Sequence, residues 1–243
     1  MQWYGTILPR IHSFVPADTI LEIACGYGRW TQFLKDLCRK LIVIDLSDKC
    51  LNKCKQRFAH CSHISYFAND GKSLDMAADA SVDFVFSFDS LVHADHTVIE
   101  AYLAQLPRVL KMEGAAFLHH SNLGEYPRYR DLQRYYRDLH RYPYRLQQIL
   151  TKWGILEADL CNRDPSVSAA SVAQWADKHS LCCVSQEIIP WATRRALIDC
   201  MSIIVRKGSL HQVENRVLRN TSFMREVEYL SHLAPLYTGI RKK

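Results

Sequence analysis

The amino-acid sequence predicts an α/β protein built on a doubly wound, mostly parallel sheet. Strand and helix patterns alternate over the first half of the chain, a glycine-bearing turn follows the first strand, and two adjacent β-rich runs lie near the end. Such alternation is typical of βαβ units. The 243 residues are 48% hydrophobic and 23% charged, which is enough for one globular domain with a full core.

Apolar runs bounded by turn residues predict five parallel strands in this first half, and amphipathic stretches between them predict helices. The first strand starts at Ile20 and runs to the glycine turn. The other strands are expected at 41–45, 63–68, 82–88 and 115–120, and the helices at 29–38, 49–59 and 97–110.

The second half of the chain departs from this rhythm after Ser121. Residues 125–162 are rich in Arg and Tyr and predict a helical insert within the single domain 1–243. The link between the β-rich runs is too short for a parallel crossover, which needs a dozen or more residues, so these strands should be antiparallel neighbours. The remaining predictions are a helix at 168–180, strands at 181–189 and 196–206, and a helix at 211–236.

Composition excludes several classes of protein. No apolar run approaches the roughly 18 residues of a membrane span, and no secretory signal is visible, so we expect a cytoplasmic protein. The nine cysteines form no C-x-x-C pair, which favours reduced thiols and argues against a metal site. The formal charge of +6 permits an anionic partner without requiring nucleic acid.

The turn after the first strand carries most of the functional information. Gly26 and Gly28 fit a dinucleotide fingerprint, but Thr31 stands where its third glycine belongs. With Glu22 before the glycines and Ala24 in place of the first one, the run resembles the first motif of class I S-adenosylmethionine-dependent methyltransferases, E/D-x-G-x-G-x-G. Glycine lets the backbone approach a ligand closely, and the helix that follows offers free N–H groups.

This resemblance implies a seven-stranded sheet of order 3-2-1-4-5-7-6 with an antiparallel last strand, and S-adenosylmethionine as cofactor. Asp45 would accept hydrogen bonds from the ribose hydroxyls, or alternatively cap a helix. Asp70, beside Asn69, would meet the adenine amino group, or alternatively form an Asx turn. The predicted cofactor-binding residues are Trp3, Glu22, Ala24, Gly26, Gly28, Trp30, Asp45, Leu46, Asn69, Asp70, Gly71, Phe88 and Asp89.

Histidines are the candidates for proton transfer. The run 87–93 lacks the Asn/Asp-Pro-Pro-Tyr/Phe and Pro-Cys signatures of adenine or glutamine N-methyltransferases and of cytosine C5 enzymes, which suits a different acceptor. His119 and His120 end the fifth strand and should point to opposite faces of the sheet. Either could serve as a base for an acceptor hydroxyl, with His93 in reserve, or all could be packed or capping residues.

The acceptor side is less determined. The chain resembles a bacterial subgroup of class I methyltransferases that act on saccharide or small-molecule hydroxyls, which favours O-methylation of a small acceptor such as a sugar or an anion. Alternatives are N-methylation of a small amine, RNA methylation through the Arg/Tyr-rich insert, and a non-catalytic binding module. The predicted acceptor residues are Tyr126, Arg163, Ser168, Trp191 and Arg194.

Overall fold

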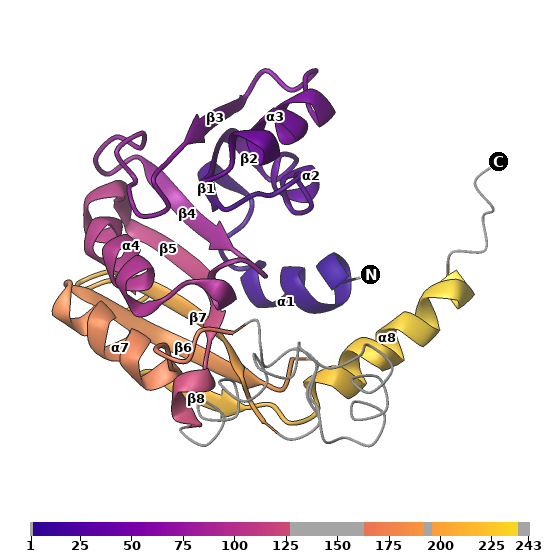
Figure 1. Cartoon of the computed structure of the whole chain (residues 1–243), viewed down its shortest axis with the longest axis vertical. Helices are drawn as coiled ribbons and strands as arrows, with labels where there is room; N and C mark the ends of the chain where they lie inside the picture. The colour runs from indigo at the N-terminus through magenta and orange to yellow at the C-terminus, as the bar shows by residue number, and fades with distance from the viewer. Residues whose placement is uncertain (1, 127–162, 192–195, 238–243) are drawn as a thin grey trace, which may run out of the picture.

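A computed structural model of the chain describes residues 2–126, 163–191 and 196–237. The predicted helical insert therefore lies outside the described residues, apart from its first two positions. The described residues form one eight-stranded sheet, with helices on both faces (Figure 1). No helix among them is long and apolar enough to span a bilayer.

The strand order is β3-β2-β1-β4-β5-β7-β6-β8, which confirms the predicted order of the first seven strands. Neighbours among β1 to β5 are parallel, whereas β7 runs antiparallel to both β5 and β6, as expected from the short link. The strands are β1 Ala17–Ile23, β2 Cys38–Asp45, β3 Ile64–Ala68, β4 Val82–Ser87, β5 Leu110–Ser121, β6 Leu181–Ile189, β7 Asp199–Arg206 and β8 Arg216–Arg219.

Two hydrophobic clusters sandwich the sheet because side chains alternate between its faces. One cluster packs the sheet against the N-terminal helices, α2, α3 and the start of α8, and the other packs it against α4 and α7. The helices are η1 Trp3–Ile7, α1 Leu8–Ile11, α2 Thr31–Leu34, α3 Asp48–Arg57, η2 Leu91–His93, α4 His96–Val109, η3 Leu123–Glu125, α7 Ala169–Lys178 and α8 Phe223–Tyr237.

Two parts of the sequence prediction were wrong. The helix expected over 29–38 is only the four-residue α2, because β2 begins as early as Cys38. The tail expected as one helix contains β8, which pairs parallel to β6, before α8 begins at Phe223. All four residues of β8 are exposed, so the strand has no hydrophobic alternation from which it could have been predicted.

Candidate functional site

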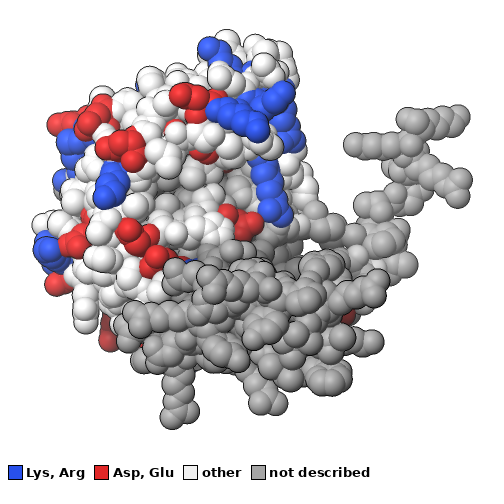
Figure 2. Space-filling model, viewed as in Figure 1, with Lys and Arg blue, Asp and Glu red and all other residues white. Residues whose placement is uncertain are grey.

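The carboxyl ends of β1, β2 and β4 meet at one edge of the sheet, where ligands of doubly wound folds bind. The turns that follow these strands hold the predicted cofactor residues from Ala24 to Gly28, Asp45 with Leu46, and Phe88 with Asp89. In Figure 2, which has the same view as Figure 1, Lys and Arg side chains gather over the region where Figure 1 shows α2 and α3.

Three residues in the turn after β1 have a left-handed backbone conformation. Ala24, Gly26 and Gly28 have φ angles of 59°, 54° and 79°, a region that costs most L-residues about 1–2 kcal/mol. A Cβ on Gly26 would meet nothing within 4 Å, so this glycine borders open space. A Cβ on Gly28 would lie 2.5 Å from the Phe58 ring and 3.0 Å from the Cys54 sulfur. Gly26 therefore faces the space available to a ligand, and Gly28 faces α3 and the turn after it.

The carboxylate of Asp45 ties this turn to the end of β2. Its two oxygens each accept one backbone N–H, from Gly26 at 2.8 Å and from Ser47 at 2.8 Å. A carboxylate offers about four lone-pair sites, so two such bonds leave room for ligand hydroxyl groups. The cap of α3 is Ser47, whose hydroxyl accepts the N–H of Cys50. The alternative of Asp45 as the helix cap is therefore wrong.

Glu22 is buried beneath the turn and does not face the open space. Its carboxyl accepts the hydroxyl of Thr31, while its Oε1 has no partner. Burial raises the pKa of Glu22 to about 8, against the lowering effect of the Thr31 hydrogen bond. The acid of this first motif is thus an internal group whose neutral form is favoured by burial, and its bond to Thr31 joins β1 to α2.

The turn after β3 holds three more of the predicted cofactor residues, Asn69, Asp70 and Gly71. Asn69 donates to the carbonyl of Ser73 and to the Tyr102 hydroxyl, and its Oδ1 accepts the N–H of Gly71. Asp70 is exposed and accepts the N–H groups of residues 72 and 73, so the Asx-turn alternative describes its main bonds. Those bonds lower the pKa of Asp70. The Leu46 side chain, 68% exposed, lies near Gly71 and offers an apolar surface for a planar base.

The two predicted cofactor tryptophans are both buried. Trp3 packs on Phe33 with ring centroids 4.8 Å apart, and Trp30 donates its indole N–H to the carbonyl of Phe88 at 3.1 Å. Trp3 is therefore a core residue here, a role that its position near the N-terminus did not reveal. Trp30 supports the loop after β4 from below, without facing open space.

The loop after β4 is fixed at a single peptide bond. The carbonyl of Phe88 accepts the Trp30 indole N–H, and the N–H of Asp89, at the other end of the same peptide, donates to Nδ1 of His119 at 3.1 Å. Asp89 has a φ of 63°, which is strained for a non-glycine residue. Its half-buried carboxylate lies 3.2 Å from the guanidinium of Arg29, in the turn after β1.

His119 is fully buried and both of its ring nitrogens are engaged. Nδ1 accepts the Asp89 N–H, and Nε2 lies 3.1 Å from Oδ2 of Asp199. Because the backbone group only donates and the carboxylate only accepts, the hydrogen of the neutral ring is on Nε2. This geometry argues against the predicted role of His119 as a proton acceptor.

His120 points to the opposite face, as predicted, and is also fully buried. Its Nδ1 lies 2.9 Å from the carbonyl of Ser121 and its Nε2 lies 2.8 Å from the hydroxyl of Ser202. Burial lowers the pKa of His120 to about 4. His93, in η2, is the exposed member of the three predicted bases.

Arg163 is a buried structural cation and does not reach outward to an acceptor. Its Nε and Nη2 donate to the two oxygens of Asp199, at 2.7 and 2.9 Å. Burial alone would raise the pKa of Asp199, but hydrogen bonds and charges from His119 and Arg163 outweigh it and lower that pKa. Sequence reasoning missed Asp199, although an acid that opens a strand of otherwise apolar character was a signal for a buried partner.

The other predicted acceptor residues are dispersed. Ser168 caps α7 by accepting the N–H of Ser171 in a capping box. Tyr126 accepts the N–H of Leu197 with its hydroxyl at 3.0 Å. Trp191 is half-buried against Phe88 and His119, with ring centroids 5.8 and 5.5 Å away, and is therefore the predicted acceptor residue closest to the β4 loop. Arg194 lies outside the described residues.

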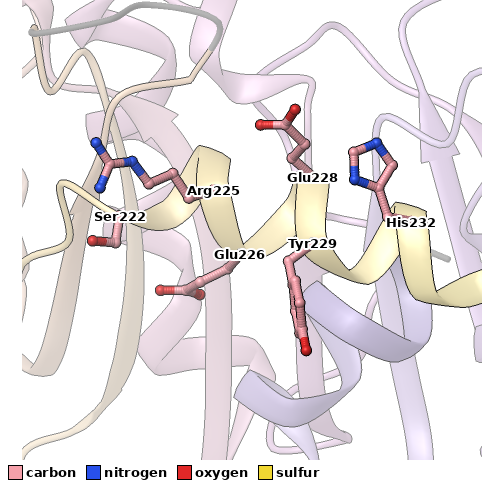
Figure 3. A pocket seen from close by; sticks show the side chains of 6 residues that line it. All are labelled: Ser222, Arg225, Glu226, Glu228, Tyr229 and His232. Atoms are coloured by element: carbon pink, nitrogen blue, oxygen red, sulfur yellow. The ribbon is translucent and has the colours of Figure 1, made fainter.

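A separate hollow lies along α8. Its lining consists of Ser222 and five side chains of α8, and Figure 3 shows that they project from this one helix. Both acidic and basic groups line it, and no predicted site residue takes part. In the described part of the chain, no group of three His, Cys, Asp or Glu side chains is arranged to hold a metal ion.

Comparison with known proteins shows similarity to methyltransferases over part of the chain. Residues 20–114 match the family described as "Methyltransferase domain". Phosphoethanolamine N-methyltransferase 1 of Caenorhabditis elegans is 27% identical over 114 residues, and Nodulation protein S of Sinorhizobium fredii is 33% identical over 55 residues. These matches cover 47% and 23% of this chain, but only 23% and 26% of the two relatives.

Solved structures extend the likeness to most of the chain. The N-methyltransferase NodS from Bradyrhizobium japonicum WM9 has a TM-score of 0.56 at 17% identity, and covers 84% of this chain and 95% of its own. The PH0226 protein from Pyrococcus horikoshii OT3 has a TM-score of 0.56 at 17% identity, with coverage of 85% and 92%. Residues 20–114 thus match a methyltransferase family model, and the chain shares the fold of the solved NodS N-methyltransferase, which supports the coarser part of the predicted resemblance.

Proposed function

We propose that this protein transfers a methyl group from S-adenosylmethionine to a nitrogen of a small polar molecule. The observation that carries the proposal is the cradle at the ends of β1 and β2. There the Asp45 carboxylate keeps free lone-pair sites beside open space at Gly26, and the exposed Leu46 side chain lies next to them. This combination of an acid, a close-approach glycine and an apolar surface suits an adenosine group.

The residues of the cradle divide the binding of S-adenosylmethionine between them. Asp45 would hold the ribose hydroxyls, Leu46 would cover the adenine, and the turn from Ala24 to Gly28 would admit the methionine part. When bound, the cofactor supplies a methyl group already activated on a sulfonium. The protein must then place the acceptor in line with the C–S bond, at about 3 Å, and exclude water.

The state of the two fully buried histidines supports a nitrogen acceptor. A hydroxyl needs its proton removed as it attacks, whereas a neutral amine attacks with its own lone pair and loses a proton afterwards. His119 and His120 have both ring nitrogens engaged, so neither is placed to remove a proton. An amine acceptor fits this arrangement better than the saccharide hydroxyl favoured by the sequence. Two of the relatives, phosphoethanolamine N-methyltransferase 1 and the solved NodS, are N-methyltransferases by name.

Cofactor binding is tested by calorimetry with S-adenosylmethionine and S-adenosylhomocysteine. The variant D45N turns one acceptor oxygen into a donor beside a backbone N–H, and should weaken binding about 10- to 100-fold, the effect of one or two charge-assisted hydrogen bonds. The matched control is D48N, because Asp48 is exposed in the first turn of α3 and should change the affinity less than about threefold. Equal affinities for D45N and the wild type would contradict the proposed cradle.

The methylated atom is tested with a matched pair of acceptors. Glucosamine and N-acetylglucosamine carry the same hydroxyl groups, but only glucosamine has a free amine. With methyl-labelled S-adenosylmethionine, we expect label on glucosamine and on phosphoethanolamine, and none on N-acetylglucosamine. The rate should rise with pH as the amine loses its proton. Equal labelling of both sugars would favour O-methylation instead, and label on RNA alone would favour the Arg/Tyr-rich insert as a nucleic-acid site.

A further inference from the structure

A buried chain of side chains connects β7 and β5 to the loop where methyl transfer is proposed. Arg163 binds both oxygens of Asp199, Asp199 accepts Nε2–H of His119, and His119 accepts the backbone N–H of Asp89. Arg163 is 5% exposed, and Asp199 and His119 are fully buried. Four segments that are distant in sequence are therefore linked in series, and the series ends at the backbone amide of Asp89.

We propose that His119, held by Asp199 and Arg163, is a positioning residue that sets the orientation of the Phe88–Asp89 peptide for methyl transfer. This inference rests on the proposed function. The peptide is gripped at both ends, since its carbonyl accepts the indole N–H of Trp30 and its N–H donates to His119. Rotation of the peptide would break both bonds.

The strain at Asp89 explains why such a grip is needed. A φ of 63° is costly for aspartate, so the loop would relax without bonds that hold it. The held conformation brings the Asp89 carboxylate to 3.2 Å from Arg29 and the Ser90 hydroxyl to 3.1 Å from the carbonyl of Ala24. The same peptide thus aligns the loop after β4 with the cofactor turn after β1.

The tautomer of His119 follows from its partners and stays fixed. Arg163 donates to both oxygens of Asp199 and stabilises it as a carboxylate. Because a carboxylate only accepts, Nε2 of His119 must donate to it and Nδ1 must accept. The ring also packs against Phe88, with centroids 4.5 Å apart and ring planes tilted by 31°. His119 therefore acts on the reaction only through the backbone that it holds.

A matched pair of variants separates this role from general packing. The side-chain oxygen of asparagine can take the place of Nδ1, so H119N keeps an acceptor for the Asp89 N–H and loses the bond to Asp199. The side-chain amide nitrogen of glutamine can take the place of Nε2, so H119Q keeps the bond to Asp199 and loses that acceptor. Both variants lose the same aromatic ring, and both bury an amide.

The measurements are amide hydrogen exchange at Asp89 and turnover with phosphoethanolamine as acceptor. We expect H119Q to exchange the Asp89 amide at least about tenfold faster than the wild type, and to lower kcat about 10- to 100-fold, with KM and cofactor Kd within about threefold. H119N should keep slow exchange and at least about ten times the kcat of H119Q. If H119Q does not fold, Trp30→Phe, which removes the bond at the other end of the peptide, should give the same two changes.

Two results would overturn the positioning role. One is equal Asp89 exchange in H119Q and H119N. The other is a loss of turnover in both variants accompanied by disappearance of the acidic limb of the pH–rate profile. That result would make His119 the proton acceptor. Absence of methyl transfer by the wild type to any amine would instead contradict the proposed function, while the exchange measurement would still decide the role of His119.

Discussion

The two halves of the strand-end edge treat their polar groups in opposite ways. Around the turns after β1 and β2, backbone N–H groups hold the Asp45 carboxylate, and Gly26 and Leu46 border open space. Around the ends of β4, β5 and β7, polar side chains bind one another away from solvent, as in the ion pair of Arg163 with Asp199. We propose that the first region receives a ligand and that the second holds a backbone in place.

Because of this difference, we expect substitutions in the two regions to affect different properties, ligand affinity in the first and folding stability in the second. Changes in the cofactor cradle should alter ligand binding more than folding, because ligand-facing atoms contribute few internal contacts. Changes in the buried network should alter folding first, because a charge left unpaired in the interior is costly. The predictions below challenge that division, beginning with the largest expected effect.

D199N should be the most destabilising of these changes. The amide keeps the shape of the side chain but leaves the Arg163 guanidinium buried without its counter-charge, a loss of about 3–5 kcal/mol in the free energy of unfolding. The control is D177N, which removes an exposed partner of Lys207 and should cost less than about 1 kcal/mol. Urea unfolding of both variants measures the difference. Similar losses for the two would mean that the buried pair contributes no more than a surface pair.

The two buried titratable groups should give stability opposite dependences on pH. The folded pKa of Glu22, about 8, lies above its ordinary value of 4.5, so the folded state binds more protons and stability falls as pH rises between those values. The folded pKa of His120, about 4, lies below its ordinary 6.5, so stability rises across that window. Above pH 6.5 the Glu22 effect dominates, about 1–2 kcal/mol up to pH 8, because less than about 0.5 kcal/mol of the His120 effect is left.

Unfolding measurements between pH 6.5 and 8 test this assignment. The variant E22Q cannot titrate and should lose the fall in stability over that range. The variant H120Q should keep the fall and lose the rise at lower pH. A fall that persists in E22Q would place the responsible proton elsewhere in the molecule.

The two glycines of the cofactor turn should respond differently to alanine. G28A places a methyl group against Phe58 and Cys54 at a left-handed φ, and should cost about 2–4 kcal/mol of stability. G26A carries the backbone strain alone, about 1–2 kcal/mol, but its methyl enters the open space and should weaken S-adenosylhomocysteine binding at least about tenfold. Calorimetry measures the binding and urea unfolding measures the stability of both variants. Binding of the ligand by G26A with the affinity of the wild type would contradict the proposed cradle.

The sequence predicted the strand ends of the cofactor half because the rules that place strands and turns are local. Alternating patterns identified the strands, and the glycines and Asp45 at successive strand ends identified the edge where they meet. The transfer half could not be predicted in the same way. Asp199 lies 36 residues from Arg163 and 80 residues from His119, so their contact exists only in the fold. Sequence reasoning could name His119 and Arg163 but not that they share one buried acid.

The smallest expected effect concerns Ala24, the departure from the glycine pattern. Ala24 has a φ of 59°, so A24G should relieve backbone strain, although glycine loses more entropy on folding and the methyl packs partly against the core. The matched control is A80G, since Ala80 has a φ of 48° but is exposed and far along the chain from the turn. We expect A80G to gain about 0.5–1 kcal/mol and A24G to gain less than about 0.5 kcal/mol. Cofactor affinity should change less than about threefold in both, because the Ala24 methyl packs toward the core; a tenfold change in A24G alone would place that methyl against the ligand and extend the cradle by one residue.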